Sequence, residues 1–264
     1  MSSRQSQLLS QKYLKAMIEI SLHNQAVIIT GASRGIGRSM AKVFAAAGAN
    51  LLLNYVQDDE AAVSLMESLV SNGADILLCK GSVIDAGFVK KMAAKCLDKW
   101  GRIDCLINNA GITKDIYFGF MKERDWHDVI DVNLNSLFYC CKAVINTMIA
   151  RRQGCIINMS SVSAVTGREG QVNYAAAKAG VLGFTKALAR EVGRYNVRVN
   201  SIITGVVDTD MTKALPRKVL NPLISQIPLG RLAQPSEVAN VALFLASKLA
   251  SFITGSCIEV HGGL

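Results

Sequence analysis

Histidine is scarce in this chain of 264 residues, which contains only His23, His127 and His261. The three are far apart and form neither an HExxH motif nor a Cys/His ligand spacing, so no metal site is predicted. The seven cysteines are odd in number and include no CxxC pair, and several lie inside apolar runs. We therefore expect free, buried thiols in a reducing compartment rather than a disulfide framework.

Long apolar runs are also missing, since none approaches the ~18 residues that a membrane span needs. Half of the residues are nevertheless hydrophobic and 19% are charged, which excludes a disordered chain. Acidic residues are in the minority: 20 Asp and Glu stand against 29 Lys and Arg, a formal charge of +9. That balance favours an acidic partner, whether nucleic acid, an anionic membrane, a phosphorylated ligand or an acidic protein.

Residues 1–24 differ from the rest in being rich in Ser, Gln and Lys, without an apolar segment typical of a secretory signal. We expect a flexible basic extension here, with a mitochondrial presequence or a start at Met17 as alternatives. The expected location is the cytoplasm, with the mitochondrial matrix as the alternative. Residues 25–264 contain no linker or repeat and are predicted to form one domain.

Within this domain, short β-branched runs alternate with amphipathic stretches, from the predicted strand at residues 26–30 to the one at 257–260. Seven strands and six helices in alternation predict an α/β fold: a single doubly wound Rossmann-type domain, with a seven-stranded parallel sheet and helices on both faces. All four prolines fall between residues 216 and 235. We expect an irregular excursion there, and favour a substrate lid over a plain surface loop.

A glycine-rich segment, residues 30–37, follows the first predicted strand and opens the first helix. Its Gly-x3-Gly-x-Gly spacing would let the backbone approach a pyrophosphate, whose charge the helix N-terminus stabilises. The alternative is a merely tight turn.

Tyr174 and Lys178 lie four residues apart on a predicted helix and so share one face. A tyrosine is a poor acid at neutral pH, because its pKa is ~10. A lysine one turn away, together with an oxidised nicotinamide, would lower that pKa and let the phenol exchange a proton with a carbonyl oxygen. Ser161 ends the preceding strand, at the edge where ligands bind in open α/β folds.

These residues, with Asn133 and the segment at 108–111, stand in the order and spacing of the short-chain dehydrogenase/reductases, which the chain resembles from about residue 25 onward. Finer matches are similar to 3-oxoacyl-[acyl-carrier-protein] reductases; they lie at residues 31–37, 173–180, 188–192, 208–211 and 227–231.

The resemblance implies a role for each catalytic position. Tyr174 is the catalytic acid/base, and Lys178 lowers its pKa and holds the nicotinamide ribose. Ser161 hydrogen-bonds the substrate carbonyl, so that Ser161 and Tyr174 together bind substrate. Asn133 anchors a water in a proton relay with Lys178.

The resemblance also implies a cofactor site, and charge suggests which cofactor. The expected cofactor-binding residues are Gly31, Ser33, Arg34, Gly35, Ile36, Gly37, Asn54, Ser82, Val83, Asn109, Ala110, Gly111, Tyr174, Lys178, Val207 and Thr209, with a structural role as the alternative for Asn109. The second strand ends at Asn54 and Tyr55, with no acid to hold a ribose 2′-hydroxyl before Asp58. Arg34 can pair with a 2′-phosphate, so NADPH is favoured over NADH. Asp58 and Asp59 are expected at a helix N-terminus.

Two positions depart from the family's usual pattern. Thr204-Gly205 stands where Pro-Gly is usual, so we expect a looser loop beside the nicotinamide. Ser82-Val83 stands where Asp-Val or Asn-Val is common, and offers a shorter polar contact near the adenine.

The expected function is NADPH-dependent reduction of a 3-oxoacyl thioester, linked to acyl carrier protein, in fatty acid biosynthesis. Arg152 and Arg194 are expected either to face this acidic carrier or to be ordinary solvated helix ends, and the resemblance implies a homotetramer. One alternative is a reductase or dehydrogenase of another carbonyl, such as a sugar, steroid or quinone. Another is a non-catalytic dinucleotide-binding subunit of a hetero-oligomer. No nucleic acid is expected, because no basic–aromatic patch accompanies the charge.

Overall fold

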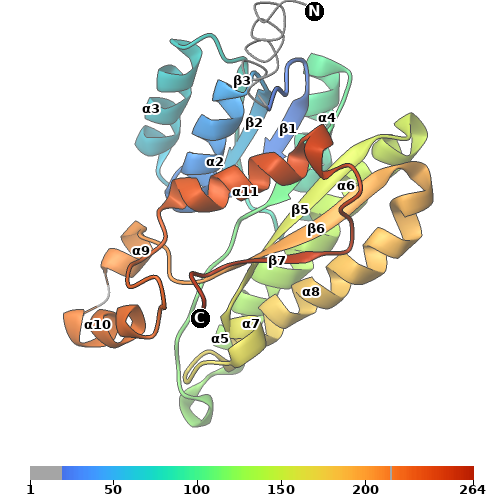
Figure 1. The fold of residues 1–264 in the computed structure, drawn as a ribbon. Coiled ribbons are helices and arrows are strands. Elements are labelled where there is room, and N and C mark those ends of the chain that lie inside the picture. Colours follow the sequence, from blue (N-terminus) through green and yellow to red (C-terminus); the bar gives the residue numbers. More distant parts are fainter. Residues whose placement is uncertain (1–19, 215) are drawn as a thin grey trace, which may run out of the picture.

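The fold is built on one parallel sheet, seen in a computed structural model that describes residues 20–214 and 216–264 (Figure 1). The sheet has seven strands in the order β3-β2-β1-β4-β5-β6-β7, every pair parallel. The strands are β1 (Ala26–Ile29), β2 (Asn50–Tyr55), β3 (Ile76–Lys80), β4 (Cys105–Asn108), β5 (Gly154–Ser161), β6 (Val197–Thr204) and β7 (Cys257–Val260). This confirms the predicted doubly wound α/β class.

Helices cover both faces of the sheet (Figure 1). The larger ones are α2 (Gly35–Ala46), α3 (Asp59–Val70), α4 (Ala86–Trp100), α5 (Glu123–Ile130), α6 (Ser136–Arg151), α8 (Val172–Val192), α10 (Arg217–Ser225) and α11 (Pro235–Ala246). Two helices of four residues each, α7 (Ser163–Thr166) and α9 (Asp210–Lys213), lie between them. Buried side chains of α2, α3 and α11 pack on one face, and those of α4, α6 and α8 on the other.

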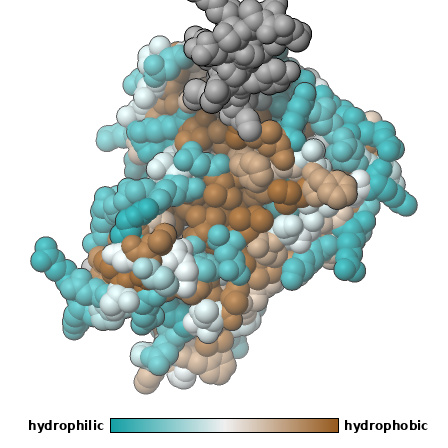
Figure 2. Space-filling view, in the orientation of Figure 1, coloured by the Kyte–Doolittle hydropathy of each residue, from teal (hydrophilic) through white to brown (hydrophobic). Residues whose placement is uncertain are grey.

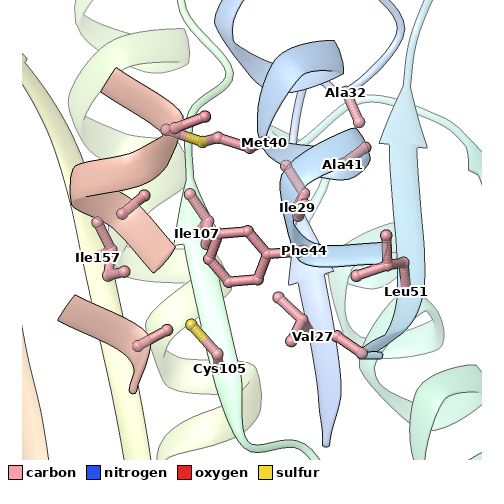
Figure 3. Packing of buried hydrophobic residues seen from close by; sticks show 14 of the residues in the cluster. Val27, Ile29, Ala32, Met40, Ala41, Phe44, Leu51, Cys105, Ile107 and Ile157 are labelled. Carbon is pink, nitrogen blue, oxygen red and sulfur yellow. The ribbon is translucent and has the colours of Figure 1, made fainter. Parts of the chain in front are cut away.

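β1 is an interior strand of the sheet and is buried on both faces. Alternate side chains of a strand point to opposite faces, so Val27 and Ile29 join one apolar cluster while Ala26 and Ile28 join the other. Phe44 of α2 is fully buried over this strand (Figure 3). Burial of each Val, Ile or Phe side chain here contributes about 1.5–3 kcal/mol to stability, so the strand that leads into the glycine-rich segment is firmly held.

The order of the strands also locates the site. From β1 the chain first adds β2 and β3 on one side, then crosses to add β4 to β7 on the other. The carboxyl ends of β1 and β4 therefore flank a topological switch point, where open α/β sheets bind ligands.

The long helical region expected at residues 123–152 is present, but it contains a feature that periodicity did not reveal. One turn of π-helix, Asp131–Asn135, joins α5 to α6. Such turns are rare inside helices and are frequent at functional sites.

An irregular excursion was expected in the proline-rich stretch. The stretch instead contains two helices, α9 and α10. Pro216 immediately precedes α10 and Pro235 opens α11, positions where the missing N–H has no helical partner to lose. Pro222 lies inside α10. Proline therefore fits the helix starts in this stretch as well as its loops.

The basic extension predicted at residues 1–24, with its possible targeting role, falls mostly on residues 1–19, outside the described residues. Leu22 is fully buried in the core, and its N–H donates to the Ala47 carbonyl at 2.7 Å. Residues 20–24 therefore lie with the domain rather than with the extension.

The described residues also bear on the other expectations from composition. All seven cysteines are free, six of them buried and Cys257 partly so, as predicted. No helix within residues 20–214 and 216–264 has both the length and the apolar character to cross a bilayer. In the same part of the chain, no group of three or more His, Cys, Asp or Glu side chains is placed to hold a metal ion.

Candidate active site

The glycine-rich segment forms a tight turn between β1 and α2. Gly31 and Gly35 have φ of +63° and +54°, a region that side chains disfavour. A Cβ on Gly37 would lie 2.3 Å from the Gly31 carbonyl oxygen, so only glycine fits there. The backbone is thus open to close approach, and the first turn of α2 presents its N–H groups without any acidic side chain. This cradle fits a pyrophosphate.

Arg34 and Asn54 occupy different positions around this turn. Arg34 is exposed at the N-terminus of α2, with no side-chain capping bond, so its guanidinium is available to an anion. Asn54 is buried at the end of β2, where its Nδ2 donates to the carbonyls of Cys79 at 3.1 Å and Gly81 at 2.9 Å. Its Oδ1 accepts a long bond from the Gly31 N–H at 3.5 Å. Asn54 therefore braces the turn.

Asn109 is likewise occupied by the backbone. Its Nδ2 donates to the carbonyls of Thr30 at 2.9 Å and Gly31 at 3.0 Å. The N–H groups of Asn109 and Ala110 both donate to the Thr30 hydroxyl. These bonds join the ends of β1 and β4, which favours the structural role for the Asn109 side chain.

The predicted catalytic side chains meet where α8 packs against β5. Ser161 ends β5, as expected. Lys178 is buried and its Nζ donates to the Met159 carbonyl at 2.9 Å, while the Ser160 hydroxyl donates to the Lys178 carbonyl. The Lys178 Nζ lies 5.6 Å from the centroid of the Tyr174 ring. The four-residue spacing thus places both groups on the face of α8 that meets the sheet.

The electrostatics of the chain alone differ from the expectation for Tyr174. Burial raises the pKa of the Tyr174 phenol, hydrogen bonding with Ser161 opposes that rise, and the charge of Asp115 adds to it. Burial lowers the pKa of Lys178 to about 8. The lowered phenol pKa expected from Lys178 is therefore not found in the chain alone, because desolvation of the phenol outweighs the other effects.

Asn133 lies on the π-helical turn with a buried, unpaired oxygen. Its Nδ2 donates to the carbonyls of Ile112 at 2.9 Å and Val129 at 2.8 Å, whereas its Oδ1 has no hydrogen-bond partner. A Cβ on Gly111 would lie 2.7 Å from that oxygen and 3.5 Å from the Lys178 Nζ. Buried polar atoms normally have partners, so this oxygen fits an ordered water near Lys178.

A cavity of about 900 Å³ opens at this edge of the sheet. Of the predicted residues, Ile36, Ser161, Tyr174, Val207 and Thr209 line it. Val219, Leu223 and Gln226 of the α10 segment line it as well, so the proline-rich stretch covers the cavity as a lid would. The volume is ample for a small ligand beside part of a dinucleotide.

Other predicted cofactor residues lie around the cavity rather than in its wall. Val83 is buried and Ser82 partly buried in the loop after β3, and Ser33 is buried in the glycine-rich turn. Asp58 caps α3 through a bond from the Ala61 N–H, as expected.

Sequence reasoning missed a polar wall that supports Ser161. The Gln171 Nε2 donates to both carboxylate oxygens of Asp115, at 3.0 and 2.9 Å, and the Ser163 hydroxyl donates to the Gln171 Oε1 at 2.8 Å. The Ser163 N–H in turn donates to the Ser161 Oγ at 3.3 Å. These residues are distant in sequence and follow no recognisable spacing.

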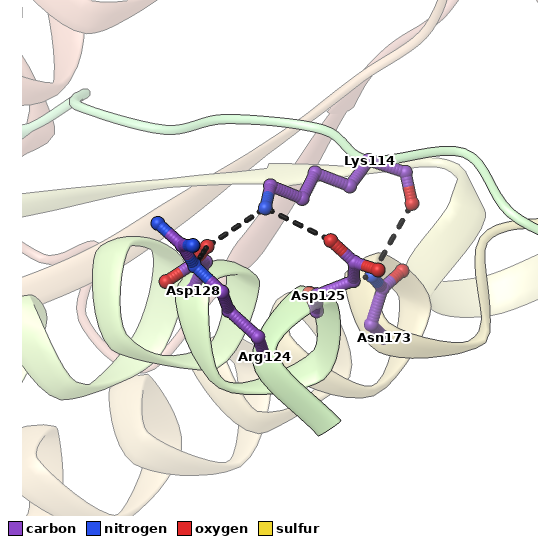
Figure 4. A network of polar contacts seen from close by, with 5 residues as sticks. All are labelled: Lys114, Arg124, Asp125, Asp128 and Asn173. Atoms are coloured by element: carbon purple, nitrogen blue, oxygen red, sulfur yellow. Dashed lines mark hydrogen bonds and ion pairs between the residues drawn. The ribbon is translucent and has the colours of Figure 1, made fainter. Parts of the chain in front are cut away.

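No role was predicted for Asn173, the residue before Tyr174, although it opens the matched segment 173–180. It is fully buried, and its Nδ2 donates to the carbonyls of Lys114 at 3.3 Å and Asp125 at 3.2 Å. The Lys114 ammonium bonds the carboxylates of Asp125 at 3.0 Å and Asp128 at 2.7 Å (Figure 4). This network fixes the start of α8, and with it Tyr174, against α5.

Thr204 replaces the rigidity of a proline with hydrogen bonds. Its hydroxyl donates to the Ser160 carbonyl at 3.2 Å, and its carbonyl accepts from the Val162 N–H at 2.8 Å. A Cβ on the next residue, Gly205, would lie 2.8 Å from the His261 Cα. Thr204 is therefore held at the end of β6, and a looser loop beside the nicotinamide stays a prediction.

Arg152 and Arg194 lie close together but away from the cavity. The Arg152 guanidinium donates to the Arg194 carbonyl at 3.0 Å. Both residues follow the carboxyl ends of helices, α6 and α8, and so lie at the edge where β5 and β6 begin. Ser161 is at the other end of β5, a strand of 8 residues, or roughly 25 Å away.

Comparisons with known proteins agree with this geometry. A family model described as "Enoyl-(Acyl carrier protein) reductase" matches residues 31–264. The 3-oxoacyl-[acyl-carrier-protein] reductase FabG of Chlamydia muridarum is 44% identical over 243 residues, covering 92% of this chain and 98% of the relative. FabG of Chlamydia pneumoniae is 45% identical over 247 residues, covering 94% and 99%. A 3-oxoacyl-[acyl-carrier-protein] reductase of Synechocystis is 43% identical over 245 residues, covering 92% and 98%. The chain therefore belongs to the short-chain dehydrogenase/reductase family.

Proposed function

We propose that this protein is a 3-oxoacyl-[acyl-carrier-protein] reductase of fatty acid biosynthesis that uses NADPH. The observation that carries the proposal is the meeting of Ser161 and Tyr174 in one cavity, with the Lys178 ammonium beneath the phenol ring. Relatives 43–45% identical over nearly their whole length carry this reductase name, which supports the same substrate class here. Their similarity favours a 3-oxo substrate over the enoyl substrate in the family model's description.

The side chains divide the chemistry between them. The Ser161 oxygen accepts the Ser163 N–H, which leaves its own proton to donate to the substrate ketone oxygen. Tyr174 donates a second hydrogen bond to that oxygen and transfers its proton as the carbonyl becomes a hydroxyl. A reduced nicotinamide, when bound, would supply a hydride for the carbonyl carbon, and with the proton from Tyr174 this would convert the 3-oxo group to a 3-hydroxy group.

Loss of that proton leaves Tyr174 to be reprotonated. Lys178, with a pKa lowered to about 8, is poised to exchange protons near neutral pH. The unpaired Asn133 oxygen would hold a water beside it, which supports the predicted relay. With an oxidised nicotinamide and a charged Lys178 nearby, the phenol pKa would fall from its raised value.

For the cofactor, the glycine-rich turn would bind the pyrophosphate and Arg34 the 2′-phosphate. Val207 and Thr209 would line the nicotinamide side, and Ala110 and Gly111 the adenosine side. Asn54 would act indirectly, by holding the turn and the end of β3 in place.

For assembly, we propose a homotetramer. Figure 2 shows apolar side chains gathered over α11, where Phe244 is partly exposed, and such surface is typical of subunit interfaces. Arg152 and Arg194 lie at the sheet edge opposite the cavity of their own subunit. In such an assembly they would contact an acidic carrier only when its substrate enters the cavity of a neighbouring subunit.

The test is an NADPH-consumption assay with an acetoacetyl thioester, comparing the wild type with Tyr174→Phe. Losing the phenol should lower kcat by about 10²–10⁴-fold, because it removes the proton donor, while the Kd for NADPH stays within about twofold. Tight NADPH binding without turnover by the wild type would favour the non-catalytic subunit. Faster turnover of a sugar, steroid or quinone would favour another carbonyl substrate, and equal rates with NADH would overturn the cofactor assignment.

A further inference from the structure

Asp115 places a carboxylate in the wall of the cavity that holds Ser161 and Tyr174. Gln171, which is 4% exposed, donates its amide to both oxygens of this carboxylate. The amide cannot turn over, because its own oxygen accepts the Ser163 hydroxyl. The carboxylate is therefore fixed in orientation rather than free to turn away.

The backbone on either side is fixed as well. The Ile116 N–H donates to the Gly170 carbonyl at 2.8 Å, next to the bond between Asp115 and Gln171. The segment after β4 and the segment before α8 are thus joined twice, once through the backbone and once through side chains. A substrate that enters beside Ser161 meets this wall without displacing it.

Two further charged residues line the cavity, Arg168 and Glu169, and like Asp115 they are exposed. They are adjacent and opposite in charge, so their fields largely offset each other at a distance. Glu169 also accepts a hydrogen bond from the Tyr117 hydroxyl. Asp115 differs from this pair because Gln171 and Ser163 connect it to Ser161, and its charge raises the pKa of the Tyr174 phenol.

We propose that Asp115 is a specificity-determining residue: its fixed carboxylate rejects carbonyl compounds that carry a carboxylate of their own and admits neutral 3-oxoacyl esters and thioesters. This proposal rests on the proposed reductase function. In a 3-oxo acid the carboxylate lies two bonds beyond the ketone that Ser161 and Tyr174 bind. It would therefore be brought near Asp115, and like charges at such a distance repel. A thioester has no charge at that position.

The experiment compares two substrates of matched carbon skeleton, acetoacetate and its neutral ethyl ester, in the wild type, Asp115→Asn and Asp98→Asn. Asp98 is an exposed acid on α4 outside the cavity, so its substitution matches the change in net charge. The expected result is that Asp115→Asn raises kcat/KM for acetoacetate relative to the ester by about five- to tenfold, and that Asp98→Asn leaves this ratio unchanged.

Ionic strength provides a second readout that does not depend on a variant folding. Salt screens charge repulsion, so the wild type's preference for the ester should weaken as salt is added, and that of Asp115→Asn should not. A preference in Asp115→Asn equal to that of the wild type, or a wild-type preference insensitive to salt, would overturn the role of Asp115. A wild type that reduces neither the ester nor an acetoacetyl thioester would instead refute the reductase function on which this inference rests.

Discussion

Gly111→Ala tests the predicted relay with a single added methyl group. Gly111 does not have a positive φ, so alanine is compatible with its backbone, and the perturbation is confined to what the new Cβ meets. That Cβ would lie 2.7 Å from the Asn133 Oδ1, and 3.5 Å from the Lys178 Nζ. Real Cβ atoms keep more than 3.0 Å from such neighbours, so the oxygen must move by at least about 0.3 Å.

Asn133 can yield only at a cost, since its Nδ2 is held by the carbonyls of Ile112 and Val129. Weakening one of these bonds costs about 1 kcal/mol, and overpacking a tight site typically costs about 1–3 kcal/mol. The oxygen that would hold the water is displaced in the same movement. We therefore expect kcat to fall by about 10²-fold, the lower end of what a positioned proton-transfer group contributes.

The assay is steady-state NADPH oxidation with an acetoacetyl thioester, alongside urea unfolding and direct measurement of the Kd for NADPH. Gly183→Ala is the matched control, because Gly183 lies on α8 with no atom within 4 Å of its Cβ position. In an exposed helix this control should keep full activity and gain about 0.5–1 kcal/mol of stability.

The double variant Gly111→Ala/Asn133→Ala decides whether the methyl acts through Asn133. If it does, the double variant should be no slower than Asn133→Ala alone, because both changes remove the same group. A kcat for Gly111→Ala within twofold of the wild type would refute the reasoning, as would full additivity of the two changes.

Three further outcomes are expected. Arg34→Ala should raise the KM for NADPH about tenfold and leave that for NADH unchanged, as measured by steady-state kinetics, because only NADPH offers a 2′-phosphate to pair with. Asp104→Asn should destabilise the fold by about 3 kcal/mol in urea unfolding with kcat retained, because the nearly buried carboxylate holds the Arg102 guanidinium by two bonds and accepts the Ala26 N–H. Because burial lowers the pKa of Lys178 from 10.5 to about 8, the folded state binds fewer protons than the unfolded chain between these pH values. The free energy of unfolding should therefore rise across that window, and Lys178→Met should flatten the rise.

The sheet could be predicted because its signals are local. Each strand is a short apolar run bounded by turn residues, and each helix shows its own periodicity, so alternation alone implied the doubly wound order. The site residues at strand ends and on α8 followed from the same frame, since carboxyl ends of parallel strands share one edge. Ser161, Tyr174 and Lys178 are together because α8 packs against β5, with only the short α7 between them in the chain.

The parts that escaped prediction depend on contacts between distant segments. Asp115 and Gln171 are 56 positions apart and meet only because two loops lie against each other. Arg152 was expected to face the carrier or to be a solvated helix end. Its sheet edge depends on the direction in which α6 runs, and a charge pattern does not predict that direction. The π-helical turn leaves no mark in a periodicity, because it shifts the helical register by a single residue.

Asn54 shows how the structure changes the argument about cofactor charge. In the sequence argument, Asn54 favoured NADPH because the position has no acid that could hold a ribose 2′-hydroxyl. In the structure the Asn54 amide donates to the carbonyls of Cys79 and Gly81, which a carboxylate cannot do because it has no proton to donate. An acid at this position would face two carbonyl oxygens without a proton to donate. The hydrogen bonds that connect the end of β3 to the glycine-rich turn through Asn54 would then be lost. The hydrogen bonds of Asn54 therefore require the absence of an acid at this position, which also suits a 2′-phosphate. The proposed preference for NADPH must then rest on Arg34 rather than on Asn54.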